Sequence, residues 1–248
     1  MKIENTPEHK TRLDIEVFGR QLSKSRSSAG DLIKRGKVTV NGIVEIKTSF
    51  LTVSTDQIRV TENMKFVSRA GDKLDGALDE WSIDVRKKTA VDIGSSTGGF
   101  VDCLLQRGIE KVIAIEVGTD QLDPSLRTND RVELHEQMDV RRFKISALVD
   151  LVVTDVSFIS LSLIFPKAYE FLKKGGEVIA LVKPQFEVGR EIAHKRKGVI
   201  RDEKERRTAF DRVVSDAEKI GFKVVSYIDS SLTGESGNRE YLLRLKKK

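Results

Sequence analysis

The chain has 248 residues, of which 39% are hydrophobic and 33% charged, so it can bury a core and remain soluble. That length fits one large domain or two small ones. No apolar run reaches the roughly 20 residues that cross a bilayer, and the N-terminal stretch lacks the apolar core of a secretory signal peptide. One cysteine excludes an internal disulfide framework, and three scattered histidines indicate no metal cluster. We expect a cytoplasmic protein without a bound metal.

The positive charge is unevenly distributed. Lys and Arg total 44 against 38 acidic residues, for a net charge of +6, and residues 1–60 alone hold 11 basic and 7 acidic residues. About a quarter of the chain therefore carries two thirds of the excess. A basic segment suggests an anionic partner, with nucleic acid first and a membrane surface second. Ordinary solubility charge explains the excess equally well, so net charge does not decide between these interpretations.

The first region, residues 11–60, begins with apolar residues near helical spacing. A second short helix is expected to start at Ser27 or Ser28 as its cap and to end near Gly36. Residues 37–46 then alternate like two strands joined by an Asn-Gly turn. Two short helices followed by a hairpin predict a small α+β unit.

The second region alternates strands with helices. Apolar, β-branched runs predict strands at residues 89–93, 111–116, 148–155, 177–183 and 222–228. Helical patterns lie between several of these runs, as at residues 99–107 and 161–172. Continuously apolar strands separated by helices indicate a parallel sheet covered on both faces, which is a doubly wound, Rossmann-like α/β domain. We place the domains at residues 1–60 and 61–248, with a linker near 55–65.

A glycine-rich turn, DIGSSTGGF at residues 92–100, directly follows the first of these strands. Glycines at a strand-to-helix turn let a cofactor approach the backbone at a helix N-terminus. The spacing matches neither the dinucleotide fingerprint nor the phosphate loop of nucleoside triphosphatases. Asp92 could repel a pyrophosphate but suits a cationic ligand such as S-adenosylmethionine.

Two further acids follow the next two predicted strands. Glu116 lies 24 residues after Asp92, near the spacing at which an acid accepts hydrogen bonds from ribose hydroxyls. Asp139 is expected at the end of the next short strand, where it could meet an adenine amino group. Three acids at successive strand ends favour an adenosyl cofactor over a purely structural turn. The candidate cofactor-binding residues are Asp92, Gly94, Ser95, Gly98, Gly99, Phe100, Glu116, Asp139 and Asp155.

Opposite charges end two of the predicted buried strands. Asp155 ends one strand, and Lys183 ends the next, immediately before Pro184. Ligand sites in such sheets lie at the carboxyl ends of the strands, and an unpaired buried charge is costly. A catalytic pair and a structural salt bridge are both consistent with this pattern.

Several strings resemble a known family. SRAGDKLDGAL, DIGSSTGGF, TDVSFISL, LVKPQFEVGR, KGVIRDE and GESGNREY resemble the TlyA family of rRNA 2′-O-methyltransferases, often labelled hemolysin A. The second region is also similar to the broader FtsJ class of S-adenosylmethionine-dependent methyltransferases. The string RLDIEVF and the stretch SRSSAGDLIKRGKVTVNG resemble the S-four type of RNA-binding domain. The matches run from about residue 11 to about residue 244, in the family's order.

The resemblance implies a catalytic tetrad of Lys, Asp, Lys and Glu. Its members fall on Lys73, Asp155, Lys183 and Glu240. A ribose hydroxyl is a poor nucleophile, so methyl transfer needs it oriented and at least partly deprotonated. A lysine acts as a base when desolvation or a second cation lowers its pKa. Lys183 is the candidate base, the two acids would orient the lysines, and the positive charges would stabilise the developing alkoxide. The turn has Ser-Ser-Thr where the broader class often has Ala-Ala-Pro.

Other basic and aromatic residues are candidates for contact with RNA. Phe158 and Phe186 closely follow the two strand-end charges and could stack on a splayed base or pack in the core. The basic candidates surround the second helix and follow the catalytic lysine. They are Arg12, Lys24, Arg26, Lys34, Arg35, Lys37, Arg69, Arg190, Lys195, Arg196 and Lys197.

The sequence therefore predicts an enzyme that methylates a ribose of ribosomal RNA within a ribosomal subunit. The family resemblance implies that this ribose belongs to a cytidine. A non-catalytic RNA-binding assembly factor and a membrane-active hemolysin are the alternatives. The intact tetrad argues against the first, and no amphipathic surface helix supports the second.

Overall fold

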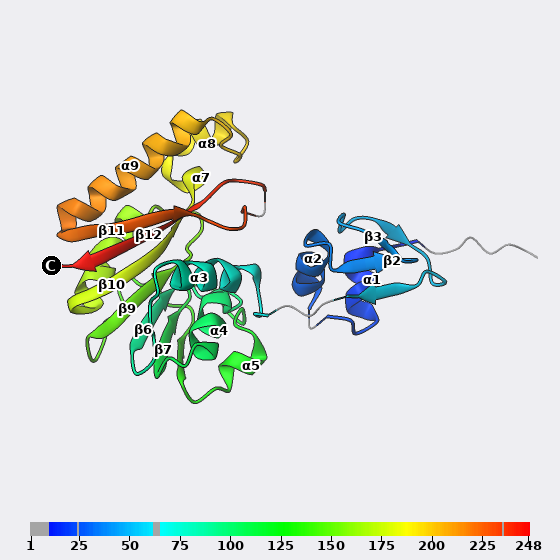
Figure 1. Ribbon diagram of the computed structural model, residues 1–248, viewed down its shortest axis with the longest axis horizontal. Coiled ribbons are helices and arrows are strands. Elements are labelled where there is room, and N and C mark those ends of the chain that lie inside the picture. Colours follow the sequence, from blue (N-terminus) through cyan, green and yellow to red (C-terminus); the bar gives the residue numbers. More distant parts are fainter. Residues whose placement is uncertain (1–9, 24, 62–64, 235) are drawn as a thin grey trace, which may run out of the picture. The chain divides into compact units, whose positions relative to one another are not determined.

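The computed structural model of the chain describes residues 10–23, 25–61, 65–234 and 236–248. It divides into two compact units, residues 1–68 and 69–248 (Figure 1). None of the helices in the described part of the chain has the length and hydropathy to span a membrane.

The described part of the first unit contains short helices and strands. They are β1 (Thr11–Arg12), α1 (Leu13–Gly19), α2 (Arg26–Lys34), β2 (Val38–Val40), β3 (Ile43–Val44), β4 (Leu51–Thr52) and β5 (Ile58–Val60). β1 pairs with β4, and a second sheet has the order β3-β2-β5. Its small core includes Leu13, Val17, Ile33 and Val38, all without solvent exposure. The apolar faces of both helices and of the central strand therefore build one core.

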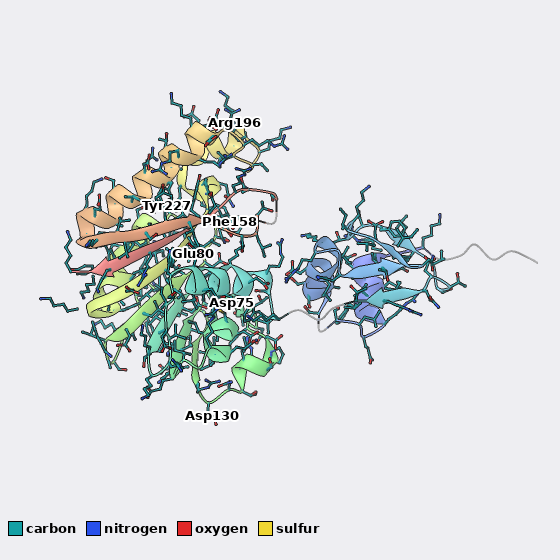
Figure 2. The ribbon with its side chains drawn as sticks, in the orientation of Figure 1. Asp75, Glu80, Asp130, Phe158, Arg196 and Tyr227 are labelled. Atoms are coloured by element: carbon teal, nitrogen blue, oxygen red, sulfur yellow. The ribbon has the colours of Figure 1, made fainter. Side chains whose placement is uncertain are left out.

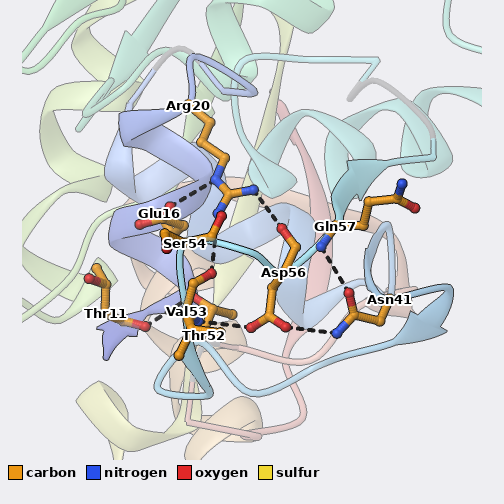
Figure 3. Close-up of polar contacts among 9 residues, drawn as sticks. All are labelled: Thr11, Glu16, Arg20, Asn41, Thr52, Val53, Ser54, Asp56 and Gln57. Carbon is orange, nitrogen blue, oxygen red and sulfur yellow. Dashed lines mark hydrogen bonds and ion pairs between the residues drawn. The ribbon is translucent and has the colours of Figure 1, made fainter. Parts of the chain in front are cut away.

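A polar network joins α1 to the turn before β5 (Figure 3). Arg20 donates to Glu16 Oε1 at 2.8 Å and to the Asp56 carbonyl at 2.7 Å. The Asp56 carboxylate accepts from Asn41 Nδ2 at 2.7 Å, and Asn41 Oδ1 accepts from the Gln57 backbone at 2.8 Å. These bonds fix the Asn-Gly hairpin turn against the rest of the unit.

Three local predictions for this unit need correction. The cap of α2 is Ser25, whose side chain accepts from the Ser28 backbone, and not Ser27 or Ser28. The predicted first helix starts later, because residues 11–12 pair as a strand with β4. β5 occupies part of the stretch 55–65 that we expected to be a linker, because it pairs with β2.

The second unit contains a seven-stranded mixed sheet in the order β11-β12-β10-β9-β6-β7-β8. The strands are β6 (Thr89–Ile93), β7 (Lys111–Ile115), β8 (Val132–His135), β9 (Val149–Thr154), β10 (Leu172–Val182), β11 (Phe222–Asp229) and β12 (Tyr241–Lys247). The helices are α3 (Arg69–Glu80), α4 (Gly99–Gln106), α5 (Pro124–Arg127), the 3₁₀ helix η1 (Leu161–Leu163), α6 (Phe165–Phe171), α7 (Pro184–Glu187), α8 (Arg190–Lys195) and α9 (Glu203–Ile220). The predicted Rossmann-like fold is confirmed.

Helices cover this sheet. Phe165 and Phe171 of α6 and Phe210 of α9 join strand residues in one large buried cluster. Figure 1 shows α9 running alongside β11, and α3 packs against α4. Burial on both faces explains why the central strands are apolar along their whole length.

The sequence prediction missed β12, which lies antiparallel between β10 and β11. Lys247, near the end of the chain, donates to the Tyr169 and Leu172 carbonyls at 2.7 and 2.8 Å. Arg244, also in β12, pairs with Glu177 of β10 at 2.9 Å. Partners on neighbouring elements hold these charges in the sheet, and the pattern of a single strand does not reveal such partners.

The helix predicted at residues 161–172 is divided. It begins as η1 and resumes as α6, with Pro166 in the first turn. Proline lacks a backbone donor, so it fits the first turn of a helix and disrupts an interior. Leu172 already belongs to β10.

Candidate functional site

Three of the four predicted catalytic residues lie at one edge of the sheet. Asp155 follows β9 and Lys183 follows β10, at the carboxyl ends of neighbouring parallel strands. Glu240 precedes β12, in which Tyr241 is the antiparallel partner of Val182. The register therefore places the backbone of Glu240 next to that of Lys183.

Lys73, on α3, reaches Glu240 across 167 residues of sequence. Its Nζ lies 2.6 Å from Glu240 Oε2, and the two side chains are 9% and 2% exposed. Gly234 leaves room for this carboxylate, since a Cβ there would collide with Glu240 Oε1. Removal of either partner would leave a buried charge uncompensated.

Lys183 forms the second ion pair of the site. Its Nζ lies 2.6 Å from Asp155 Oδ1 and donates a hydrogen bond to Ser157 Oγ at 2.9 Å. The same Nζ is 6.0 Å from the centre of the Phe186 ring. The four predicted residues therefore form two ion pairs, and Ser157 is a further contact of Lys183.

The glycine-rich turn has the backbone that its sequence predicts. Gly94 and Gly98 have φ of +79° and +94°, which a glycine adopts without steric cost. A Cβ on Gly94 would lie 2.9 Å from Val156 Cγ1. Gly98 caps α4, whose first residue is Gly99. The Phe100 side chain belongs to the core, so only its backbone can face a ligand.

Asp92 is the most unusual charged group of the site. Both of its carboxylate oxygens are buried and have no hydrogen-bond partner within the described residues. Burial raises the pKa of Asp92 well above its usual value, and the charges of Asp155 and Glu116 add to the shift. Ser95 Oγ nearby in the turn is likewise buried without a partner in that part of the chain. A cationic, hydrogen-bonding ligand such as S-adenosylmethionine fits these groups.

The other two acids already have partners. Glu116 accepts from the Ser96 backbone at 2.9 Å and from the Gly118 backbone at 2.8 Å. Asp139 lies four residues beyond β8 rather than at its end, and both its oxygens contact Arg141. That guanidinium lowers the pKa of Asp139 to about 2. Any ligand that contacted Glu116 would therefore meet a carboxylate that already accepts from the turn, and one that contacted Asp139 would meet a carboxylate already paired with Arg141.

The basic residues of the first unit gather on and near its two helices. Arg12 and Arg26 both pair with Asp14, at 2.9 Å each. The other candidates are Lys34, at the end of α2, and Arg35 and Lys37, which follow it. Lys24 lies outside the described residues, and Arg69 is the first residue of α3.

A second basic segment follows α7. Lys195, Arg196 and Lys197 are exposed, and Arg196 pairs with Glu205 at 2.8 Å. Figure 2 shows Arg196 at the end of the unit opposite Asp130. Arg190 begins α8, but its side chain is not among the described ones.

Phe158 is 91% exposed, which excludes a place in the core. Figure 2 labels Phe158. This residue has φ of +65°, and its ring centre lies 5.1 Å from that of the half-buried Phe186. The exposed ring of Phe158, next to the half-buried Phe186, offers a face on which a base could stack.

Two buried residues near the site, Asn238 and Glu187, were not predicted from the sequence. Asn238 accepts from the Ile200 backbone at 2.9 Å and donates to the Gly198 carbonyl at 2.8 Å. Glu187 contacts the loop after β9. Both stand in strings that carry the family resemblance, GESGNREY and LVKPQFEVGR, but their roles depend on contacts 26 to 40 residues away. In the described part of the chain, no group of three His, Cys, Asp or Glu could hold a metal ion.

Comparisons with known proteins bear on this arrangement. The family described as FtsJ-like methyltransferase matches residues 66–247. Hemolysin A of Brachyspira hyodysenteriae is 40% identical over 93% of this chain and 98% of its own. The 16S/23S rRNA (cytidine-2′-O)-methyltransferase TlyA of Mycobacterium tuberculosis is 39% identical over 96% of this chain and 90% of its own. A solved Streptococcus thermophilus structure under the hemolysin name is 36% identical, with a TM-score of 0.76, over 96% of this chain and 89% of its own.

Proposed function

The chain belongs to the FtsJ-like methyltransferase family, and we propose that it transfers a methyl group from S-adenosylmethionine to a ribose 2′-hydroxyl of ribosomal RNA. The name of the Mycobacterium tuberculosis relative describes that reaction at a cytidine. The proposal depends on two ion pairs, Lys73–Glu240 and Lys183–Asp155, and on Asp92, whose carboxylate has no hydrogen-bond partner among the described residues. We propose a ribosomal subunit as the substrate.

The cofactor would lie over the glycine-rich turn. Asp92 and Ser95 would supply buried hydrogen-bond acceptors. Glu116 would accept hydrogen bonds from the ribose hydroxyls of the cofactor, and Asp139 would accept one from its adenine amino group. The backbone at Gly94, Gly98, Gly99 and Phe100 allows close approach. The cofactor supplies an activated methyl group on a cationic sulfur.

Lys183 would act on the acceptor hydroxyl. In its neutral form its Nζ would accept the 2′-hydroxyl proton, and S-adenosylmethionine would supply the methyl group that the ribose oxygen receives. Asp155 and Ser157 hold that Nζ in place. The Lys73–Glu240 pair adds a second cation that favours the developing alkoxide.

RNA would contact both units. The basic residues of the first unit would bind phosphates, and Lys195 and Lys197, which are exposed, would do so in the second unit. Phe158 and Phe186 would stack on the target base. We propose that residues 1–60 are the S-four-type RNA-binding domain and that residues 61–248 perform the transfer.

The first experiment supplies isotopically labelled S-adenosylmethionine to separated ribosomal subunits from a strain that lacks the gene. Label in a ribose of one subunit would support the reaction and identify the substrate. Cofactor binding without label in either subunit would contradict this substrate and favour another RNA. If the protein neither binds the cofactor nor transfers label, a non-catalytic RNA-binding factor would be favoured. Dye release from lipid vesicles tests for hemolysin activity, which the name of the Brachyspira relative describes.

Replacing Lys183 tests the assigned base. We expect Lys183→Ala and Lys183→Arg both to lose at least about 100-fold in methylation rate, because an arginine keeps the charge but does not give up its proton. Cofactor affinity should change little in either variant. Lys219→Ala, at an exposed lysine on α9, is the matched control. Substantial activity in Lys183→Arg would show that only the positive charge is required.

A further inference from the structure

The loops after β9 and β10 meet at two separate places. The first meeting lies next to the sheet, where Lys183 contacts Asp155 and Ser157. It holds the start of the β9 loop against the start of the β10 loop. Residues 158–160 extend beyond it before η1 begins.

The second meeting is built by Glu187, the last residue of α7. Its Oε2 accepts from Ser160 Oγ at 2.6 Å, and its Oε1 accepts from the Leu161 backbone at 2.9 Å. Glu187 is 6% exposed. These bonds join the far end of the β9 loop to the end of α7, four residues after Lys183.

Phe158 lies in the chain between the two meetings. Its φ of +65° is a left-handed conformation that a bulky residue adopts only at a cost, and its ring is exposed. Such strain persists where the surroundings fix the backbone on both sides. Here Ser157 is held by Lys183, and Ser160 and Leu161 are held by Glu187.

We propose that Glu187 is a positioning residue for methyl transfer, which fixes the β9 loop so that Asp155 and Phe158 keep their places relative to Lys183. This inference rests on the proposed function. A carboxylate suits the position because it can accept from two donors at once. Its burial is unfavourable, since desolvation raises the pKa of Glu187. The charge of Asp216 also raises this pKa, and the charge of Arg212 lowers it. A residue that only filled space would carry no charge.

The test compares variants on both sides of the junction. We expect Glu187→Ala and Ser160→Ala each to lower the single-turnover methylation rate, by about 10- to 100-fold for Glu187→Ala and less for Ser160→Ala. Cofactor Kd should stay within about twofold, because neither residue belongs to the glycine-rich turn. Glu187→Gln should recover part of the rate, since its amide can still accept from Leu161. The double variant should lose no more than the worse single variant. Glu170→Ala, at an exposed glutamate on α6, is the control.

Hydrogen exchange of the amides at residues 157–161 gives a readout independent of activity. Faster exchange there in Glu187→Ala and Ser160→Ala, but not in Glu170→Ala, is expected. A rate within twofold of wild type in Glu187→Ala would overturn the proposal, as would unchanged exchange. If Glu187→Ala unfolds, Ser160→Ala and Glu187→Gln decide by the same measures. A wild-type protein that does not methylate RNA would overturn the proposed function and the role of Glu187 in methyl transfer with it, whereas unchanged exchange in an active protein would overturn only the role of Glu187.

Discussion

Asp92, near the end of β6, carries a cost in the ligand-free protein that the proposed cofactor site would explain. Burial and two neighbouring acids raise its pKa well above the usual value, and its oxygens lack partners among the described residues. The native state therefore binds this proton more tightly than the unfolded chain does. Stability should decrease as the pH rises from the ordinary aspartate pKa towards the raised value.

Asp92→Asn should remove this pH-dependent cost. We expect the ligand-free variant to have a higher Tm than wild type at neutral pH, since each pKa unit corresponds to about 1.4 kcal/mol. Its affinity for S-adenosylmethionine should fall, because the ligand loses an anionic partner. Thermal unfolding with and without cofactor, from pH 5 to 8, measures both effects. Asp84→Asn, at an exposed aspartate that pairs with Arg86, should not raise the Tm. An unchanged pH dependence in Asp92→Asn would assign the cost to another group.

At the scale of the element, the turn between β6 and α4 depends on Gly98. Its φ of +94° is left-handed, and a Cβ would come 2.7 Å from Leu122 Cδ1. Gly98→Ala should lower the free energy of unfolding by about 1–3 kcal/mol and weaken cofactor binding. Gly76→Ala is the matched control, because Gly76 lies inside α3 and a Cβ there would make only an ordinary van der Waals contact, so alanine should be neutral or stabilising. Denaturant unfolding and calorimetric titration with the cofactor measure the two effects. Equal stability of both variants would contradict the assigned strain.

At the scale of the whole molecule, the proposed function assigns RNA binding to the first unit and methyl transfer to the second. Lys34→Glu combined with Lys37→Glu, in the first unit, should weaken RNA binding and lower the slope of log Kd against log salt by about 0.7–0.9 for each phosphate that the protein no longer neutralises. Cofactor affinity should not change, because the turn belongs to the second unit. Lys47→Glu combined with Arg59→Glu, at two exposed basic residues of the first unit, makes the same change in net charge and is the control. Filter binding over a salt series measures the slope, and equal slopes in the charge-reversed variant and this control would remove these lysines from the interface.

The sequence by itself determined the alternation of strands and helices, the glycine-rich turn and the strand-end charges Asp155 and Lys183. These features are local: hydrophobic period, glycine spacing and position at a strand end can all be read from neighbouring residues. Lys73 and Glu240 came from the family resemblance, because their pairing joins residues 167 positions apart.

Only the tertiary structure decided the placement of β12, the partners of Asp139 and Lys247, and the junction made by Glu187. In each case a charged or polar side chain takes its role from a group on another element. Periodicity records which face of a strand or helix is apolar, but it does not record which distant donor or acceptor a buried charge will meet. The sequence therefore predicted the reaction and most of the sheet, while the contacts around the predicted catalytic residues required the folded chain.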